Sequence, residues 1–162
     1  MIHWLGRGYR KRRNSILKGD SYKRVVLSGE GEATSLKILV ADDEPEILRF
    51  FKIMLEDAGY NVITARNGQE CLQAYKTEMN KTSNENNDPF DLVLLDYRMP
   101  ELNGLEAANQ ILALYPNQKL LMVTAFSGVL DIKDEKLKKM KIMAKPFETD
   151  DLLSTISQLV KH

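Results

Sequence analysis

The amino-acid sequence predicts an α/β domain in which helices cover both faces of a doubly wound, five-stranded parallel sheet. Two observations lead to this fold class. From Leu36 onward, short apolar segments alternate with segments whose apolar residues recur every three or four positions, which is the pattern of strands and amphipathic helices in turn. The central apolar segments are also nearly continuous, which is typical of strands buried on both faces.

Each strand is short and ends at a polar residue or a turn. We expect the strands at 37–41, 60–65, 91–96, 119–124 and 141–144. The first helix follows the first strand, begins at Pro45 and is closed by Gly59. Proline suits the first turn of a helix, and glycine suits the residue just past its end.

The later helices carry end signals as well. Asn67 is the expected N-cap of the second helix, with Glu70 as its partner in a capping box. The third helix stops before Pro116, and Thr149 is the expected cap of the last one. These signals complete five strand–helix units, the fourth of which has only a weakly periodic, lysine-rich segment in place of a clear helix.

The charge distribution divides the chain into two parts, residues 1–35 and a domain at 36–162. We expect residues 1–35 to form a basic, flexible N-terminal arm with one short strand at Val25–Leu27. Residues 1–36 hold eight basic and three acidic residues, a net charge of +5, whereas 37–162 hold 15 and 20, a net charge of −5. The neutral total therefore hides a basic arm on an acidic domain. Binding of the arm to nucleic acid or anionic lipid is the less favoured alternative to a solvated tail.

The composition excludes several classes of protein. The chain has 162 residues, 43% hydrophobic and 28% charged, which is ordinary for one globular domain with a tail. A single cysteine, Cys71, cannot form an internal disulfide, and no run approaches the ~18 apolar residues of a membrane helix. The basic start lacks the apolar region of a secretory signal. We therefore expect a cytoplasmic protein with no membrane span and no DNA-binding domain.

Polar side chains follow the expected strands at the points where they end. Asp42 and Asp43 come after the first strand, Asp96 ends the third, Thr124 ends the fourth and Lys145 follows the fifth. The carboxyl ends of parallel strands meet at one edge of the sheet, where ligands of this fold class bind. We therefore expect these five side chains to form one cluster.

The chemistry of such a cluster points to phosphoryl transfer. Clustered carboxylates need a cation, and Mg²⁺ is commonly held by one or two carboxylates together with a phosphate. A carboxylate can attack phosphorus to give an aspartyl phosphate, which would make Asp96 the nucleophile and leave Lys145 to neutralise phosphoryl charge. The ordinary alternatives are that Asp42 and Asp43 only cap a helix and that Asp96 forms a structural ion pair with Lys145.

Four motifs stand at these strand ends: ILVADDEPEI, LVLLDYRMPELNG, LLMVTA and AKPF. In this order they resemble the receiver domain of response regulators in bacterial and archaeal two-component systems. The resemblance covers about residues 36–162. It implies a flavodoxin-like sheet in the order 2-1-3-4-5, signal transduction by phosphorelay, and Mg²⁺ as the cofactor.

The resemblance also implies roles for individual residues. Asp96 matches the phosphoacceptor, and Asp42 and Asp43 match the acidic pair, of which Asp43 is the expected direct Mg²⁺ ligand. The metal set then comprises Asp42, Asp43, Asp96 and the backbone carbonyl of Arg98.

Further positions match the switch and the loop around the acceptor. Thr124 matches the switch hydroxyl, and Lys145 matches the lysine that contacts the phosphoryl oxygen, before a Lys-Pro bond that is often cis. Met99-Pro100 and Gly104 match the loop beneath the acceptor. One position departs from the family: Ile142 stands where a switch aromatic is usual, so we expect phosphorylation to change the surface by another route.

We interpret the chain as a stand-alone receiver that takes a phosphoryl group from a histidine kinase or histidine phosphotransfer protein, acts on a downstream protein and is not a turnover enzyme. One alternative is a phosphate-independent, receiver-like interaction module, for which Ile142 leaves room. The other is an aspartyl-phosphate phosphatase of the haloacid-dehalogenase type. That class needs a second aspartate two residues after the nucleophile, where this chain has Arg98.

Overall fold

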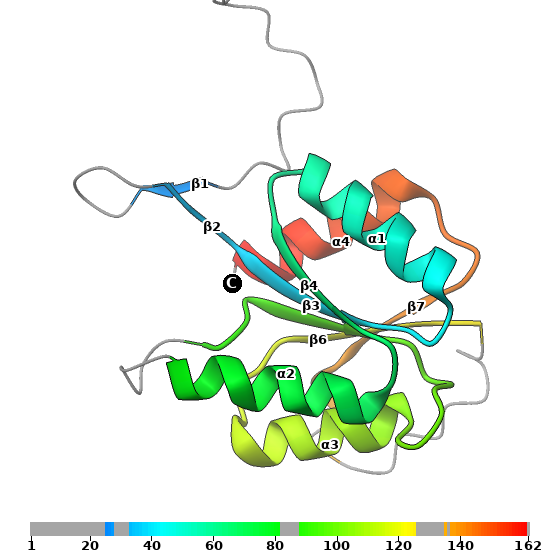
Figure 1. Cartoon of the computed structure of the whole chain (residues 1–162). Helices are drawn as coiled ribbons and strands as arrows, with labels where there is room; N and C mark the ends of the chain where they lie inside the picture. Colours follow the sequence, from blue (N-terminus) through cyan, green and yellow to red (C-terminus); the bar gives the residue numbers. More distant parts are fainter. Residues whose placement is uncertain (1–24, 28–32, 82–87, 126–134, 136, 162) are drawn as a thin grey trace, which may run out of the picture.

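The computed structural model describes residues 25–27, 33–81, 88–125, 135 and 137–161. They contain a five-stranded parallel sheet in the order β4-β3-β5-β6-β7 (Figure 1). Its strands are β3 (Lys37–Ala41), β4 (Asn61–Ala65), β5 (Leu92–Leu95), β6 (Leu120–Thr124) and β7 (Lys141–Ala144). Counted within this sheet, the order is 2-1-3-4-5, and the predicted fold class is confirmed.

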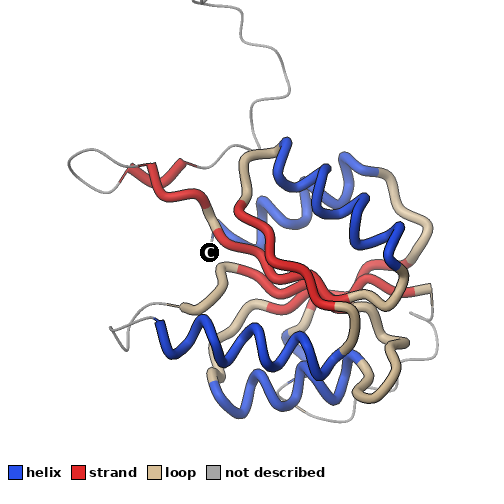
Figure 2. Tube along the Cα trace, viewed as in Figure 1, coloured by secondary structure: helices blue, strands red, loops and turns tan. Residues whose placement is uncertain are grey.

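Helices cover both faces of the sheet, as Figures 1 and 2 show. The helices are α1 (Pro45–Asp57), α2 (Gly68–Lys81), α3 (Gly104–Leu114) and α4 (Thr149–Lys161), with a short 3₁₀ helix η3 (Leu137–Lys139) before β7. Helices α1 and α4 lie on one face, and α2 and α3 lie on the other. Within the described part of the chain, no helix is long and apolar enough to cross a bilayer.

The sheet is the shared wall of two hydrophobic cores. Along β5, Val93 and Leu95 pack toward α2 and α3, whereas Leu92 and Leu94 pack toward α1 and α4. All four side chains are buried. Successive side chains of a strand point to opposite faces, so a strand covered on both sides needs an unbroken apolar run, as the sequence of β5 has.

The helix ends agree with the sequence signals in part. Helix α1 is closed by Gly59 at φ 92°, whose N–H donates to the carbonyl of Glu56 at 2.9 Å, while the N–H of Tyr60 donates to that of Leu55 at 3.0 Å. This is the glycine-terminated end that the sequence predicts. Thr149, in contrast, is the first residue of α4 and not its cap. The first helical hydrogen bond runs from the N–H of Leu152 to the carbonyl of Glu148, so Glu148 stands at the cap position.

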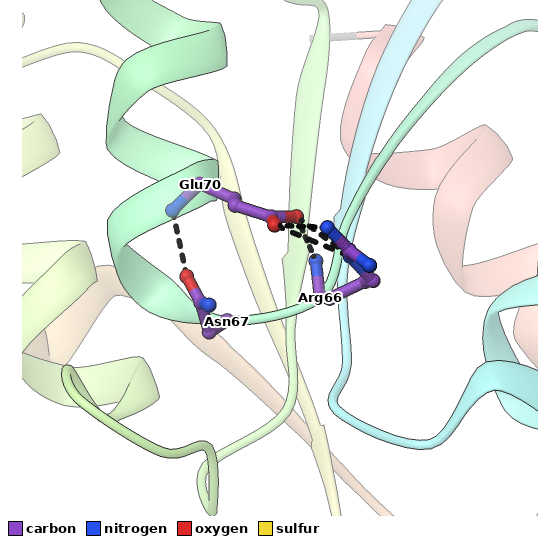
Figure 3. A network of polar contacts seen from close by, with 3 residues as sticks. All are labelled: Arg66, Asn67 and Glu70. Atoms are coloured by element: carbon purple, nitrogen blue, oxygen red, sulfur yellow. Dashed lines mark hydrogen bonds and ion pairs between the residues drawn. The ribbon is translucent and has the colours of Figure 1, made fainter.

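The start of α2 differs from the predicted capping box (Figure 3). The Asn67 side chain accepts the backbone N–H of Glu70 at 2.7 Å, as expected. The Glu70 carboxylate, however, accepts the backbone N–H of Arg66 at 2.9 Å and also pairs with its guanidinium. A complete capping box occurs instead at the start of α3, between Asn103 and Glu106. The prediction for α2 was therefore wrong in its second half, because a nearby arginine competes for the carboxylate.

The described part of the N-terminal arm contains more structure than expected. The predicted strand β1 (Val25–Leu27) is present, and it pairs antiparallel with β2 (Ala33–Ser35), which the sequence analysis did not anticipate. The predictions for residues 1–24 and for the first part of the lysine-rich segment after Thr124 fall outside the described residues.

A truncated protein that starts at Ser35 should fold and accept phosphate like the full-length chain. Leu36 packs into the core on the α1 side, and the Ser35 hydroxyl donates to the carbonyl of Gly59 at 2.7 Å, so the contacts that begin the domain are retained. Circular dichroism on heating and intact mass after phosphorylation measure both properties. An unfolded product would mean that Val25–Leu27 or Trp4 packs on the domain.

Glu78 on α2 is a buried carboxylate held by two lysines. Its Oε2 accepts from Lys37 Nζ and its Oε1 from Lys81 Nζ, both at 2.7 Å. These hydrogen bonds hold the pKa of Glu78 below its usual value. The ionised carboxylate therefore stabilises the fold above its unfolded pKa of about 4.3, and this contribution is lost as the pH falls through the lower, folded pKa.

We expect Glu78→Gln to lower the free energy of unfolding by about 1–3 kcal/mol at neutral pH, because charged hydrogen bonds are lost at a buried site. The difference from wild type should shrink as the pH falls below the unfolded pKa of about 4.3 toward about pH 3, because protonation of the wild-type side chain removes the same stabilisation. Urea unfolding at both pH values measures this. Glu70→Gln, at the exposed pair with Arg66, is the control and should have a smaller effect. An equal loss for Glu78→Gln at both pH values would contradict the role of its charge.

Candidate functional site

The carboxyl edge of the sheet brings the predicted polar residues together. Asp42 follows β3, Asp96 follows β5 and Lys145 follows β7. Lys145 Nζ lies 2.7 Å from Oδ2 of Asp42 and 3.3 Å from Oδ1 of Asp96. One ammonium group thus bridges two carboxylates from different strands. The structural ion pair between Asp96 and Lys145 is present, but Lys145 is closer to Asp42.

Three carboxylates converge beside this lysine. Asp42, Asp43 and Asp96 each offer one oxygen, and these oxygens all lie within 4.8 Å of one another. Asp42 and Asp96 are buried, at 1% and 9% exposure, whereas Asp43 is exposed. Carboxylate oxygens at this spacing match the ligands that Mg²⁺ takes in proteins. The exposed side of the cluster leaves room for water or a phosphate.

Backbone hydrogen bonds orient the two buried carboxylates. Oδ1 of Asp42 accepts the N–H of Glu44 at 2.9 Å, and Oδ2 of Asp96 accepts the N–H of Arg98 at 3.0 Å. The N–H of Asp96 donates to the carbonyl of Ala41 at 2.8 Å, which ties the two strand ends together. The N-cap position of α1 is Glu44, so Asp42 lies before the helix and does not cap it. Its other oxygen accepts from Lys145.

The electrostatics of the cluster follow from burial and mutual repulsion. Burial raises the pKa of Asp96, and the charge of Asp42 adds to this effect, although Lys145 opposes it. Burial alone would lower the pKa of Lys145, but hydrogen bonds and attraction from Asp42 and Asp96 outweigh it and raise that pKa. The site therefore contains more negative charge than Lys145 alone can neutralise, which favours binding of a cation.

The loop after Asp96 is tightly packed against that residue. A Cβ on Gly104 would lie 2.2 Å from the carbonyl oxygen of Asp96, and the N–H of Gly104 donates to the carbonyl of Tyr97 at 2.9 Å. Glu101 has φ 67°, an uncommon conformation for a residue other than glycine. The role of Gly104 in this loop was expected, but no sequence signal identified Glu101.

Thr124 and Lys145 meet where β6 and β7 end. Thr124 is fully buried, and its carbonyl accepts the backbone N–H of Lys145 at 2.9 Å. The Lys145–Pro146 bond is cis. Ile142 pairs in register with Met122 of β6 and is partly buried against the core beneath α2 and α3. A surface hollow at the acidic cluster is lined by Asp43, Glu44, Asp96, Arg98, Ala125 and Lys145.

Comparison with known proteins identifies the family. The sequence model of the response regulator receiver domain matches residues 38–157. The chain belongs to the response regulator receiver family. Response regulator receiver protein CpdR of Brucella abortus is 31% identical to this receiver over 125 residues, covering 76% of this chain and 96% of CpdR.

Other relatives are longer proteins. The transcriptional regulatory protein ZraR of Escherichia coli is 30% identical over 129 residues, which are 79% of this receiver chain and 27% of ZraR. The alkaline phosphatase synthesis transcriptional regulatory protein PhoP of Bacillus subtilis is 32% identical over 134 residues, or 78% of this chain and 49% of PhoP. This receiver therefore spans about a quarter to a half of these relatives.

Solved structures agree with the receiver fold. The response regulator TrrA of Thermotoga maritima, in complex with Mg²⁺-BeF, superposes with a TM-score of 0.63 at 33% identity, covering 76% of this chain and 98% of TrrA. A CheY-like receiver domain protein of Methanospirillum hungatei superposes with a TM-score of 0.65 at 27% identity, covering 79% and 95% of the two chains. This receiver thus shares a fold with a protein that was crystallised with magnesium.

Proposed function

We propose that this receiver accepts a phosphoryl group on Asp96 from a histidine kinase or a histidine phosphotransfer protein and signals through a changed partner surface. The observation that carries the proposal is the cluster at the carboxyl edge. There, oxygens of Asp42, Asp43 and Asp96 lie within 4.8 Å of one another, and Lys145 Nζ lies 3.3 Å from Asp96. Membership of the receiver family supports the same function.

The donor set fits Mg²⁺, since all three side chains offer carboxylate oxygens. The ion would be held by Asp43 as a direct ligand, together with Asp42, Asp96 and the backbone carbonyl of Arg98. When bound, it would neutralise negative charge on the phosphoryl group. The exposure of Asp43 beside two buried carboxylates gives the ion a route of entry from solvent.

The remaining chemistry falls to residues of the chain. An ionised carboxylate oxygen of Asp96 attacks the phosphorus and forms the new P–O bond, while the bond to the donor histidine nitrogen breaks and that nitrogen keeps the electron pair. The ammonium of Lys145 is placed to hold a phosphoryl oxygen that develops charge. The Thr124 hydroxyl, at the end of the neighbouring strand, would hydrogen-bond to the same group.

Two other functions are less well supported. An aspartyl-phosphate phosphatase would need an acid–base aspartate at the position of Arg98, whose backbone N–H instead orients Asp96. A phosphate-independent interaction module would not require Asp42, Asp43 and Lys145 to converge on Asp96.

The match over 96% of CpdR supports action as a separate receiver. The longer relatives ZraR and PhoP support the alternative of an attached output domain, although the described residues contain none.

Intact mass after incubation with acetyl phosphate and Mg²⁺ tests the proposal. Wild type should gain the mass of one phosphoryl group, and Asp96→Asn should gain none. Asp150→Asn, on the exposed first turn of α4, is the matched control and should react like wild type. Removal of Mg²⁺ with a chelator should prevent the gain. Phosphorylation of Asp96→Asn, or no reaction of wild type with any phosphodonor, would refute the assignment.

Ile142 should keep its rotamer when Asp96 is phosphorylated. Isoleucine is β-branched, with a restricted χ1, and Ile142 packs against the core. It also has no large ring that could move in response to Thr124. The partner surface should then change through the backbone after Thr124 and through added negative charge near Lys133–Lys141. Methyl NMR of Ile142 and amide shifts of residues 125–141, with and without BeF₃⁻, measure this. A rotamer change at Ile142 with unchanged amides would contradict it.

A further inference from the structure

A second hollow lies at the opposite edge of the sheet from the acidic cluster. Lys119 precedes β6 and contributes to the hollow, whereas Thr124 ends the same strand. At about 3.3 Å per residue, β6 separates the two sites by roughly 13 Å or more. The walls come from the end of α3, the turn before β6, the segment around η3 and α4. This hollow is therefore distinct from the proposed phosphorylation site.

The walls of the hollow are apolar, and its rim is basic. Leu112, Leu120, Met140 and Leu159 supply hydrocarbon surface, while Lys119 and Lys139 supply the charges. Among the described residues, no acidic side chain belongs to the lining. An apolar pocket with a few converging polar groups is the usual form of a small-molecule site.

The two rim lysines have no charged partner among the described residues. Within the described residues, neither the Lys119 nor the Lys139 ammonium makes an ion pair or a side-chain hydrogen bond. Lys138, the immediate neighbour, pairs with Glu135 instead. Two cations without a partner among the described residues lie beside apolar side chains, in a domain whose net charge is −5. This combination matches a ligand that carries both negative charge and hydrocarbon.

We propose that this hollow binds a small amphiphilic anion, with a carboxylate or phosphate head between Lys119 and Lys139 and a short aliphatic tail against Met140 and Leu159. The volume of about 230 Å³ lies below the ~300–1,000 Å³ of pockets for drug-sized ligands, which favours a short tail. The flexible Met140 side chain can adapt to the ligand. The proposal does not depend on phosphorylation of Asp96.

NMR titration of the full-length protein tests the ligand class. Octanoate and octyl phosphate, each below its micelle concentration, should shift the Met140 methyl and the Asn117 and Lys119 amides in a saturable way. Octanamide, which keeps the tail without the charge, and inorganic phosphate, which keeps the charge without the tail, should each bind at least tenfold more weakly. Tighter binding of one amphiphile would identify its head group as the preferred one.

Paired variants test the role of the lysines. Lys119→Ala/Lys139→Ala should weaken octanoate or octyl phosphate binding at least tenfold, whereas Lys138→Ala should bind like wild type. Both proteins should still be phosphorylated by acetyl phosphate, which separates this site from the acidic cluster. Equal binding of octanamide, an equal loss in Lys138→Ala, or Met140 shifts with an acidic peptide but neither amphiphile would overturn the proposal.

Discussion

Asp43→Ala is expected to abolish phosphorylation of Asp96 while leaving the fold intact. Asp43 is the exposed member of the three-carboxylate cluster, and it belongs to neither of the two described hydrophobic cores. Removing it takes away one carboxylate oxygen and one negative charge from the site proposed for Mg²⁺. Affinity for Mg²⁺ should fall by at least the roughly 10–100-fold that loss of a supporting group costs at metal sites.

The neighbouring acid Glu44 offers a matched control for Asp43. Glu44 is also exposed and lines the same hollow, but it does not belong to the cluster of three carboxylates. Glu44→Ala should therefore retain phosphorylation and most of the Mg²⁺ affinity. Calorimetric titration with Mg²⁺, intact mass with acetyl phosphate and thermal unfolding compare the two variants. If Asp43→Ala were phosphorylated as well as wild type, Asp43 would not be part of the proposed site.

Gly104→Ala is expected to displace Asp96, the proposed phosphoacceptor, and to destabilise the protein. The new Cβ would lie 2.2 Å from the carbonyl oxygen of Asp96 and 3.1 Å from the sulfur of Met122. The first contact is far inside van der Waals distance and involves a backbone atom, so the backbone at Asp96 or at residue 104 has to move. Overpacking of this kind costs about 1–3 kcal/mol. A displacement near 1 Å can slow a positioned reaction by roughly 10²-fold.

Gly68→Ala separates the two effects of Gly104→Ala. A Cβ at Gly68 would lie 2.2 Å from the carbonyl oxygen of Leu102, which is an equally close contact at a residue that carries no part of the acidic cluster. Both variants should lose stability in urea unfolding, but only Gly104→Ala should lose most of its phosphorylation rate once folded protein is compared. Similar rates in the two variants would show that the contact with Asp96 does not position the acceptor.

The fold could be predicted because its elements carry local signals. The unbroken apolar run of β5 requires cover on both faces, and Gly59 can adopt φ 92° to end α1. Where a second residue competes for the same group, local signals were insufficient. Glu70 follows the capping-box pattern, yet its carboxylate bonds to Arg66 and not to the N-cap N–H. Strand β2 was missed because its three residues show no apolar pattern.

For the site, the sequence by itself determined which residues lie at the carboxyl edge. Asp42, Asp96 and Lys145 each follow a short apolar strand, and parallel strands carry such ends to one side of the sheet. Strand length and period are local properties, so a single sequence suffices to predict them.

Only the tertiary structure decided how these groups pair and how closely they pack. Lys145 lies nearer to Asp42, at 2.7 Å, than to Asp96, at 3.3 Å, although Asp42 is 103 residues away along the chain. The contact between Gly104 and the Asp96 carbonyl likewise depends on how the loop returns to the sheet. Such distances follow from strand order, loop path and the packing of two cores, because these bring together residues that share no local pattern.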